Sequence, residues 1–291
     1  MVQAESLTKF YGDKPALINA SFDVRRGEVF SFLGPNGAGK TTTIRLMLGF
    51  IKPTRGKVFV YGVQPFDDGK FSRVKEIIGF VPEEFSFPRG LKGRDIVNYM
   101  ARIRGGSPRL DELLEIFPID LDKKVETYSR GMKQILAIIL AFMSDPELII
   151  LDEPTTGLDP LLRERFLSMV REEARKGKTV FLSSHVLSEV QKVADRVCLI
   201  RDGRIIALEE LRTLLGKAGK IIKAKLSKPA TRNELLEVEG VIKVEISNNE
   251  VIVIASRGYG EILSLLSSHG ILDIEVRGMT LEELFMHFYE R

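Results

Sequence analysis

Residues 34–41 read GPNGAGKT, and this stretch predicts the fold of the chain. It fits the pattern G-x-x-x-x-G-K-[ST], a loop in which backbone N–H groups turn inward around phosphate oxygens. An apolar run at residues 29–33 precedes it and predicts a buried strand, and residues 42–49 predict a helix. A bound phosphate would therefore lie at a helix N-terminus, where unpaired N–H groups and the helix dipole favour anions.

The residues of this loop are candidates for nucleotide contact. We expect Lys40 to place its charge at the β- and γ-phosphates and the Thr41 hydroxyl to bind Mg²⁺. The other candidates in the loop and the first helical turn are Gly34, Pro35, Asn36, Gly37, Ala38, Gly39 and Thr42.

A second informative stretch, LIILDEPTTGLDP, covers residues 148–160. Four apolar residues predict a buried strand that ends in two adjacent acids, at the edge where α/β proteins bind ligands. We expect Asp152 to hold Mg²⁺ through its water shell and Glu153 to accept a proton from water attacking the γ-phosphate. Taken alone, this stretch is equally consistent with a strand that ends in a solvated acidic turn.

The composition narrows the class of protein. The chain has 291 residues, 44% hydrophobic and 29% charged, with 43 basic and 40 acidic side chains. A net charge of +3 is too balanced to imply a nucleic-acid-binding tract by itself, and we expect no nucleic-acid partner. The single cysteine, Cys198, is consistent with a reducing compartment. We expect no signal peptide, because the N-terminus has Glu5 and Lys9 and lacks a long apolar core. We expect no membrane span, since the longest apolar stretch, around residues 135–143, is about half the ~20 residues that a span needs.

The order of predicted elements indicates a nucleotide-binding domain over residues 1–216. Residues 1–25 resemble antiparallel strands with a turn at Tyr11-Gly12-Asp13. Residues 84–146 contain helical periods broken by turns, which predict an inserted helical subdomain. From Ser129 onward, helices and strands alternate, as they do around a largely parallel sheet.

The remainder of the chain predicts a separate small domain. The stretch GKAGK at residues 216–220 is the best linker candidate. Residues 220–291 then read β-α-β-β-α-β, the split βαβ order of a ferredoxin-like α+β domain. A final helix is expected from Thr280, because Thr280 and Glu283 have capping-box spacing. Its apolar face would consist of Leu281, Leu284, Phe285 and Phe288.

With these motifs in this order, the segment from about Ser6 to Leu208 resembles the ATP-binding cassette (ABC) family. The resemblance implies a P-loop ATPase core with an antiparallel β subdomain and the helical subdomain. It assigns Tyr11 to stacking on adenine, although an aromatic here also fits a strand-edge cluster. His185, after the strand at residues 179–183, matches the histidine that touches the γ-phosphate, whereas a lone histidine is usually a surface residue.

The resemblance also implies that two such domains pack head to tail, with each ATP between one phosphate loop and the other domain's signature motif. Residues 129–134, SRGMKQ, occupy the signature position. Ser129 reads as the N-cap of a helix over Gly131–Met143 that would point at the partner's γ-phosphate. Asp159 matches the loop that follows the acidic pair. Loss of the γ-phosphate would then loosen the dimer.

Two residues depart from the family pattern. Arg130 stands where the signature usually has a glycine, and it would either reach phosphate or crowd the loop; we favour tolerance, since Gly131 remains. Glu83 stands where the family usually has a glutamine that senses Mg²⁺ and water. A carboxylate can ligate Mg²⁺ but adds negative charge near the γ-phosphate. Alternatively, Glu83 is a solvated loop acid.

A single cassette resembles the ATPase subunit of a transporter, similar to exporters of the ABC-2 type. The implied partners are ATP, a separate integral-membrane permease at the cytoplasmic face, and a second cassette that is either a copy of this chain or a paralogue. Phe85 and Phe87 are candidates for contact with the permease. The C-terminal domain has three readings: it stabilises the dimer, contacts the partner, or is a packing appendage.

Other ABC classes are the alternatives. DNA-associated members carry a long coiled-coil insertion and translation factors carry two cassettes, and neither feature is seen here. A nucleotide-dependent regulatory module without hydrolysis should lack the base, whereas Glu153 and His185 are both present.

Overall fold

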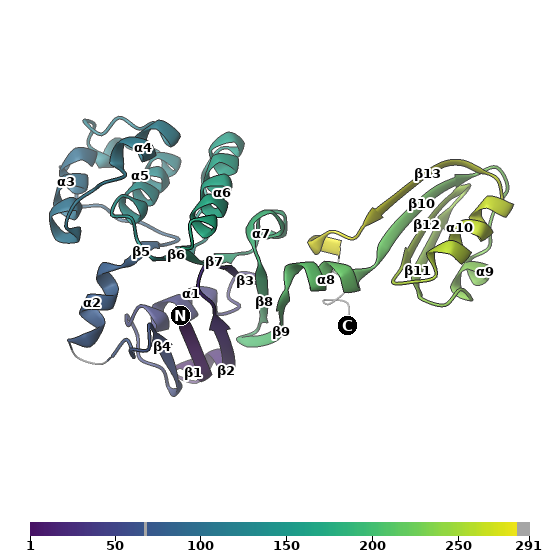
Figure 1. Ribbon diagram of the computed structural model, residues 1–291, viewed down its shortest axis with the longest axis horizontal. Helices are drawn as coiled ribbons and strands as arrows, with labels where there is room; N and C mark the ends of the chain where they lie inside the picture. Colours follow the sequence, from purple (N-terminus) through teal and green to yellow (C-terminus); the bar gives the residue numbers. More distant parts are fainter. Residues whose placement is uncertain (67–68, 284–291) are drawn as a thin grey trace. The chain divides into compact units, whose positions relative to one another are not determined.

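The computed structural model describes residues 1–66 and 69–283, and the chain divides into two compact units between Glu209 and Glu210 (Figure 1). This division precedes the boundary predicted at residues 216–220. The structure moves the boundary because residues 211–218 form helix α8 (Leu211–Ala218), which contains Gly216. Gly216 lies inside this helix, where a glycine costs only about 1 kcal/mol, and Gly219 ends the helix with a φ of 88°.

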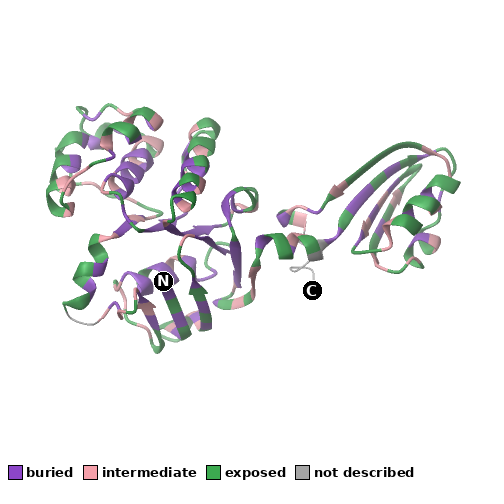
Figure 2. Ribbon diagram, in the orientation of Figure 1, coloured by how far each residue is buried: buried purple, intermediate pink, exposed green. Residues whose placement is uncertain are grey.

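The central sheet of the first unit has the strand order β5-β6-β7-β3-β8-β9. In chain order its strands are β3 (Val29–Leu33), β5 (Ile78–Val81), β6 (Leu148–Asp152), β7 (Thr179–Ser184), β8 (Arg196–Arg201) and β9 (Arg204–Glu210). The pairs from β5 to β8 are parallel. Strands β3, β6 and β7 are buried along their whole length, as expected for a parallel sheet covered on both faces (Figure 2). The predicted largely parallel sheet is confirmed.

A second, antiparallel sheet has the order β2-β1-β4, with β1 (Val2–Tyr11), β2 (Lys14–Val24) and β4 (Arg55–Val60). Gly12 adopts a φ of 58° at the predicted turn between β1 and β2. The ring of Phe22 in β2 lies 5.7, 5.4 and 6.2 Å from those of Phe30, Phe32 and Phe181 in the central sheet. Each aromatic pair at such distances contributes about 0.5–1.5 kcal/mol of interaction energy beyond the burial of its surface. This cluster therefore stabilises the packing of the two sheets.

Helices cover the other face of the central sheet, where Figure 1 shows α5 and α6 above it. The helices of this unit are α1 (Lys40–Met47), α2 (Lys70–Glu76), α3 (Gly93–Arg104), α4 (Leu110–Ile116), α5 (Arg130–Phe142), α6 (Pro160–Arg175) and α7 (Leu187–Val193), with a 3-10 turn η1 at Val125–Thr127. Elements α3, α4, η1 and α5 form the predicted helical subdomain. Within the described residues, no helix has the length and apolarity to cross a membrane.

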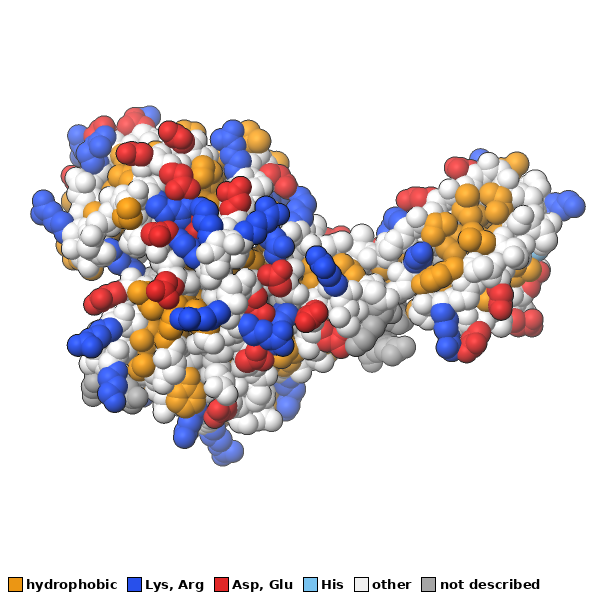
Figure 3. Space-filling model, in the orientation of Figure 1, with side chains coloured by type: hydrophobic (Ala, Val, Ile, Leu, Met, Phe, Trp, Pro, Cys, Tyr) orange, Lys and Arg blue, Asp and Glu red, His pale blue; other side chains and the backbone are white. Residues whose placement is uncertain are grey.

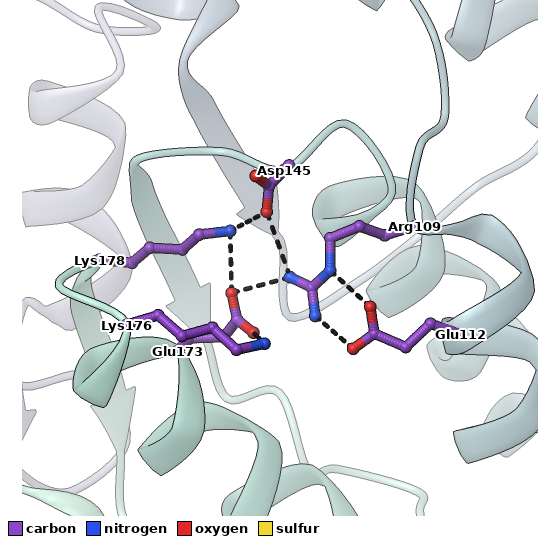
Figure 4. A network of polar contacts seen from close by, with 6 residues as sticks. All are labelled: Arg109, Glu112, Asp145, Glu173, Lys176 and Lys178. Carbon is purple, nitrogen blue, oxygen red and sulfur yellow. Dashed lines mark hydrogen bonds and ion pairs between the residues drawn. The ribbon is translucent and has the colours of Figure 1, made fainter.

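A polar network joins the helical subdomain to the C-terminal end of α6 (Figure 4). Its members are Arg109, Glu112, Asp145, Glu173, Lys176 and Lys178. Arg109 donates two hydrogen bonds to Glu112, at 2.9 and 2.7 Å, and one to Glu173 at 2.8 Å. Because Glu173 is fully buried, removing Arg109 would leave a desolvated carboxylate with fewer partners. The network therefore holds α4 against α6.

The second unit has the predicted β-α-β-β-α-β order. After α8, its elements are β10 (Lys220–Leu226), α9 (Arg232–Leu236), β11 (Val241–Ser247), β12 (Glu250–Ala255), α10 (Tyr259–Ser268) and β13 (Ile271–Gly278). The strands form an antiparallel sheet in the order β11-β12-β10-β13. Leu235 of α9 and Leu266 of α10 share one buried core with alternate residues of β10 and β12, so both helices lie on one face of this sheet.

The predicted capping box at Thr280 is confirmed. The backbone N–H of Thr280 donates to Glu283 Oε2 at 2.8 Å, and the backbone N–H of Glu283 donates to Thr280 Oγ1 at 3.2 Å. Leu281 is buried. The remaining residues of the predicted apolar face, Leu284, Phe285 and Phe288, lie outside the described residues.

Candidate functional site

The phosphate loop connects β3 to α1 and depends on two of its glycines. A Cβ on Gly34 would lie 2.3 Å from the carbonyl oxygen of Ile200. Gly39 has a φ of 109°, and a Cβ there would lie 2.5 Å from the carbonyl oxygen of Ala16. Both positions therefore require glycine. Helix α1 begins at Lys40, two residues earlier than predicted, so the loop leads directly into the helix N-terminus.

Lys40 is held inside this loop and is only 5% exposed. Its Nζ donates to the carbonyl oxygens of Gly34 and Pro35, at 2.8 and 3.1 Å, and lies 3.1 Å from Glu153 Oε1. The ammonium group thus has a fixed position at the loop centre, next to the predicted acidic pair. An anion entering the loop meets a charge that is already oriented.

The acidic pair lies at the carboxyl end of β6, as predicted. Asp152 is opposite Ser183 in the parallel register of β6 and β7, and Ser183 Oγ donates to Asp152 Oδ1 at 2.5 Å. Burial raises the pKa of Asp152 above its ordinary value, although hydrogen bonds from Ser183 and Thr41 act in the opposite direction. The Thr41 hydroxyl and the Asp152 carboxylate therefore adjoin one another, a pair of hard oxygen donors of the kind Mg²⁺ takes.

Glu153 is 4% exposed and has a φ of 49°, a conformation uncommon for residues other than glycine. Its Oε2 lies 2.8 Å from Nδ1 of His185, which follows β7 and is 47% exposed on its side chain. The carboxylate thus stands between Lys40 and His185. Backbone strain of this kind persists where the surroundings fix it, and it is found most often at functional sites.

A cavity of ≈ 170 Å³ lies beside the phosphate loop, and both Glu83 and Glu153 line it. The Glu83 side chain is exposed, and its pKa is raised above the ordinary value by partial desolvation and by the charges of Asp152 and Glu153. Glu83 thus lines the cavity together with Glu153 while its side chain stays exposed, and its role at the nucleotide stays a prediction.

Tyr11 does not reach this cavity, whose lining includes Ala16 instead. Tyr11 ends β1, is 47% exposed, and lies beneath Lys9 Nζ, which is 5.3 Å from the ring centroid. Its adenine-stacking role stays a prediction.

The signature segment forms the start of α5. Ser129 Oγ accepts a hydrogen bond from the backbone N–H of Met132 at 3.2 Å, which confirms the predicted N-cap. A Cβ on Gly131 would lie 2.7 Å from the carbonyl oxygen of Gly157, so Gly131 permits a close approach of α5 to the loop after β6. The stem of Arg130 packs across Gly157: a Cβ added to Gly157 would lie 3.3 Å from Arg130 Cγ.

Ser129, Arg130, Gly131 and Asp159 are not among the residues that line the cavity at the phosphate loop. Asp159 caps α6, its Oδ1 accepting from the backbone N–H of Leu162 at 3.0 Å. Ser129, Arg130 and Asp159 are exposed. The structure thus brings together the phosphate loop, acidic pair, Glu83 and His185, and it leaves the signature group on the surface.

Three side chains of this region were missed by the sequence analysis. Ser183 binds Asp152, Gln134 Nε2 donates to the carbonyl oxygen of Pro154 at 2.8 Å, and Thr155 Oγ1 donates to Glu189 Oε2 at 2.8 Å. The partners are 20 to 34 residues apart in the chain. Only for Ser183 was there a signal, its place at the end of a predicted strand.

Comparison with known proteins places the chain in a family. Residues 17–156 match the family model described as ABC transporter. The chain is 33% identical over 296 residues to the bacitracin transport ATP-binding protein BcrA of Bacillus licheniformis, with 98% of this chain and 96% of that protein covered. The chain belongs to the ABC transporter ATP-binding proteins.

Other relatives and solved structures of this family agree. The linearmycin resistance ATP-binding protein LnrL of Bacillus subtilis (strain 168) is 32% identical over 316 residues, covering 100% of this chain and 99% of its own length. The structure of an ATP-binding subunit of an ABC transporter has a TM-score of 0.68 and 31% identity, over 74% of this chain and 91% of that one.

A dimeric ATP-binding cassette, MJ0796, in a post-hydrolysis state bound to ADP and Pi has a TM-score of 0.66 and 27% identity, over 73% of this chain and 99% of that one. As an ABC ATPase, this chain is the ATP-binding and ATP-hydrolysing subunit of a transporter, and the similar cassette MJ0796 is a dimer.

Proposed function

We propose that this chain hydrolyses ATP with Mg²⁺ between two copies of itself and so drives export through a separate membrane permease. The contacts of Glu153 support this most directly: its carboxylate lies 3.1 Å from Lys40 Nζ and 2.8 Å from His185 Nδ1. Groups from the phosphate loop, β6 and the end of β7 thus meet beside one cavity. Hydrolysis of a triphosphate needs a cation, a base and a group that contacts the γ-phosphate, and in this proposal these are Lys40, Glu153 and His185.

In this proposal each group has a distinct task. Lys40 neutralises the β- and γ-phosphates, and Glu153 accepts the proton of the attacking water. His185 contacts the γ-phosphate and orients the Glu153 carboxylate through their shared hydrogen bond. A triphosphate competes with Glu153 for the charge of Lys40, so binding would free the carboxylate for the water.

The same site has donors for Mg²⁺. Thr41 and Asp152 would hold the ion, with Glu83 as a further acid at the cavity, and the ion would neutralise charge on the phosphate oxygens. Within the described residues, no cluster of three or more acids, histidines or cysteines forms an all-protein metal cage. Two oxygen donors next to a phosphate loop fit an ion that keeps waters and takes phosphate oxygens as ligands.

The second copy would complete the site. Ser129 and Gly131 present the N-terminus of α5, a 13-residue helix, at the surface. Such a terminus carries partial positive charge and unpaired N–H groups that suit a γ-phosphate. Because the phosphate loop, the acidic pair and the signature are all present in one chain, two copies would make two complete sites. We therefore favour a homodimer over a pair with a paralogue.

The permease and the direction of transport are inferred from relatives. The names of similar proteins refer to bacitracin transport, Nod factor export and linearmycin resistance. By analogy, this chain would bind the cytoplasmic face of an export permease. Phe85 and Phe87 stack at 5.6 Å and are partly buried against the core of the first unit, so at most their exposed edges would contact that partner.

Co-purification from membranes tests this function. The full chain, tagged and expressed in its own cells, should bring down a protein of about six membrane spans, and that complex should hydrolyse ATP. Recovery of ribosomes or DNA in place of a membrane protein would contradict the proposal and favour a non-transport ABC ATPase. The variant Glu153→Gln, purified in parallel, should bring down the same permease without comparable turnover.

A further inference from the structure

Glu189 is a buried acid next to the site that the proposed chemistry does not use. It lies in α7 (Leu187–Val193), four residues after His185, and is 3% exposed. Its Oε2 accepts a hydrogen bond from Thr155 Oγ1 at 2.8 Å, and its Oε1 lies 3.3 Å from Arg163 Nε. The carboxylate is thus shared between two other segments of the fold.

Those two segments meet at the loop after β6. Thr155 is two residues after Glu153, and the loop ends at Asp159, the N-cap of α6. Arg163 lies in the first turns of α6. Glu189 therefore joins the helix that follows His185 to the loop that begins with Glu153. Within the described residues, Glu189 is the acid that contacts both this loop and α6 from α7.

A buried carboxylate is costly unless it is paired, so its retention here requires a compensating contact. Burial raises the pKa of Glu189 above its ordinary value, while Thr155 and Arg163 act in the opposite direction. Thr155 is also buried. Removing the Glu189 carboxylate would leave the Thr155 hydroxyl without its acceptor and release the loop from α7.

We propose that Glu189 is a positioning residue that fixes the separation between Glu153 and His185 by tying Thr155 to α7. The proposal rests on the catalytic roles inferred for those two residues. The 2.8 Å contact between Glu153 Oε2 and His185 Nδ1 requires that the loop after β6 and the start of α7 keep a fixed distance. A shift of about 1 Å at such a site can cost up to about 10²-fold in rate.

Packing of α7 on its neighbours has other support. Lys192 of α7 forms an ion pair with Glu164 of α6 at the surface. Arg171 of α6 donates to the carbonyl oxygen of Val193 at 2.8 Å. Neither contact involves the loop after β6. The α6–α7 contacts therefore hold the helices together, whereas the Glu189–Thr155 hydrogen bond reaches the loop that carries Glu153.

The test compares steady-state ATP hydrolysis of the full chain across a small set of variants. Glu189→Ala and Thr155→Val should each lower kcat about 10-fold, while KM for ATP changes less than about 2-fold, because neither residue lines the cavity. Glu189→Gln keeps an acceptor for Thr155 and should stay within about 3-fold of wild type. Glu164→Gln, which breaks the surface pair between the same helices, is the matched control and should leave kcat unchanged.

The double variant separates a shared contact from two independent effects. If Glu189 acts through Thr155, Glu189→Ala with Thr155→Val should be no slower than either single variant. The proposal would be overturned if the kcat losses of the two single variants multiplied in the double variant. It would also be overturned if Thr155→Val kept a kcat within twofold of wild type. Thr155→Val is nearly isosteric, so it carries the test even if Glu189→Ala fails to fold. Should Glu153→Gln keep full turnover, the catalytic assignment fails first, an outcome distinct from failure at Glu189.

Discussion

The two groups of residues expected to surround ATP differ in how they are built into the chain. Lys40, Asp152 and Glu153 are buried and contact one another or their neighbours. Ser129, Arg130 and Asp159 are exposed, and the side chains of the two caps among them accept hydrogen bonds from their own helices. The first group is assembled within one chain. The second is a surface formed on the N-termini of two helices.

This difference indicates a division of labour. A preassembled cation–acid–histidine group can bind a triphosphate and arrange the chemistry in a single chain. An exposed helix N-terminus has nothing to bind until a second molecule brings an anion to it. ATP hydrolysis should therefore depend on the first group for the chemical step and on the second for dimer formation. The predictions below separate these two contributions.

The largest effect is expected from the preassembled group. Glu153→Gln removes the base while keeping its size, and it should lower turnover at least about 10²-fold, the usual scale for a general base. ATP should still bind, so the dimer should persist in the presence of ATP. Sedimentation and a phosphate-release assay measure both effects. Near-normal turnover would show that Glu153 is not the general base. It would also contradict the assignment of the chemical step to the buried group.

Lys40→Ala should act on binding within one chain. The loop would lose the ammonium that three oxygen atoms hold in place, and ATP affinity should fall about 10- to 100-fold, as for loss of a charged hydrogen-bond donor. Titration with a fluorescent nucleotide measures this in the monomer. Undiminished affinity would contradict the assignment of residues 34–41 as the phosphate loop.

Arg130→Gly tests how much the exposed signature group contributes to turnover. Because the stem of Arg130 packs across Gly157 and the residue as a whole is exposed, we expect turnover to change by at most about 3-fold, with ATP binding to the single chain unchanged. Ser129→Ala, which removes the N-cap beside it, serves as the comparison. A rise of 10-fold or more in turnover for Arg130→Gly would show that the arginine crowds the contact with the partner.

Glu83→Gln should give an effect that is no larger than that of Arg130→Gly and that depends on pH. Since the pKa of Glu83 is raised, the side chain is charged at high pH and becomes neutral as pH falls through that raised pKa. A charged Glu83 opposes the γ-phosphate, so the variant should be about 3-fold faster than wild type at high pH. The two rates should converge at low pH. Equal rates and equal Mg²⁺ dependence across the range would show that Glu83 does not face the nucleotide.

Much of the fold followed from periodicity and breakers in the sequence. The strands at 29–33 and 241–247 have their predicted bounds, since alternation and apolar runs report burial directly. Helix α8 and strand β9 were not predicted. Gly216 and the nearby lysines resemble a linker locally, whereas the structure forms a helix over Leu211–Ala218.

The sequence predicted the site residues that lie within recognisable motifs and missed those outside them. The phosphate loop, the acidic pair and His185 carry recognisable spacing, and the structure brings them together. Ser183, Gln134 and Glu189 act through contacts between strands and helices that are distant in the chain. Single-sequence spacing contains no record of the parallel register that sets Ser183 opposite Asp152. Residues of this kind become visible only in three dimensions.

The central claim is that the exposed signature group of one copy completes the buried site of another. A structure of the Glu153→Gln variant with ATP and Mg²⁺ tests it most directly. We expect a dimer in which Ser129 Oγ and the Gly131 backbone N–H of one copy lie about 3 Å from γ-phosphate oxygens bound to the other copy's Lys40. An ATP-bound chain whose Ser129 and Gly131 face solvent, or a dimer joined elsewhere, would contradict the account.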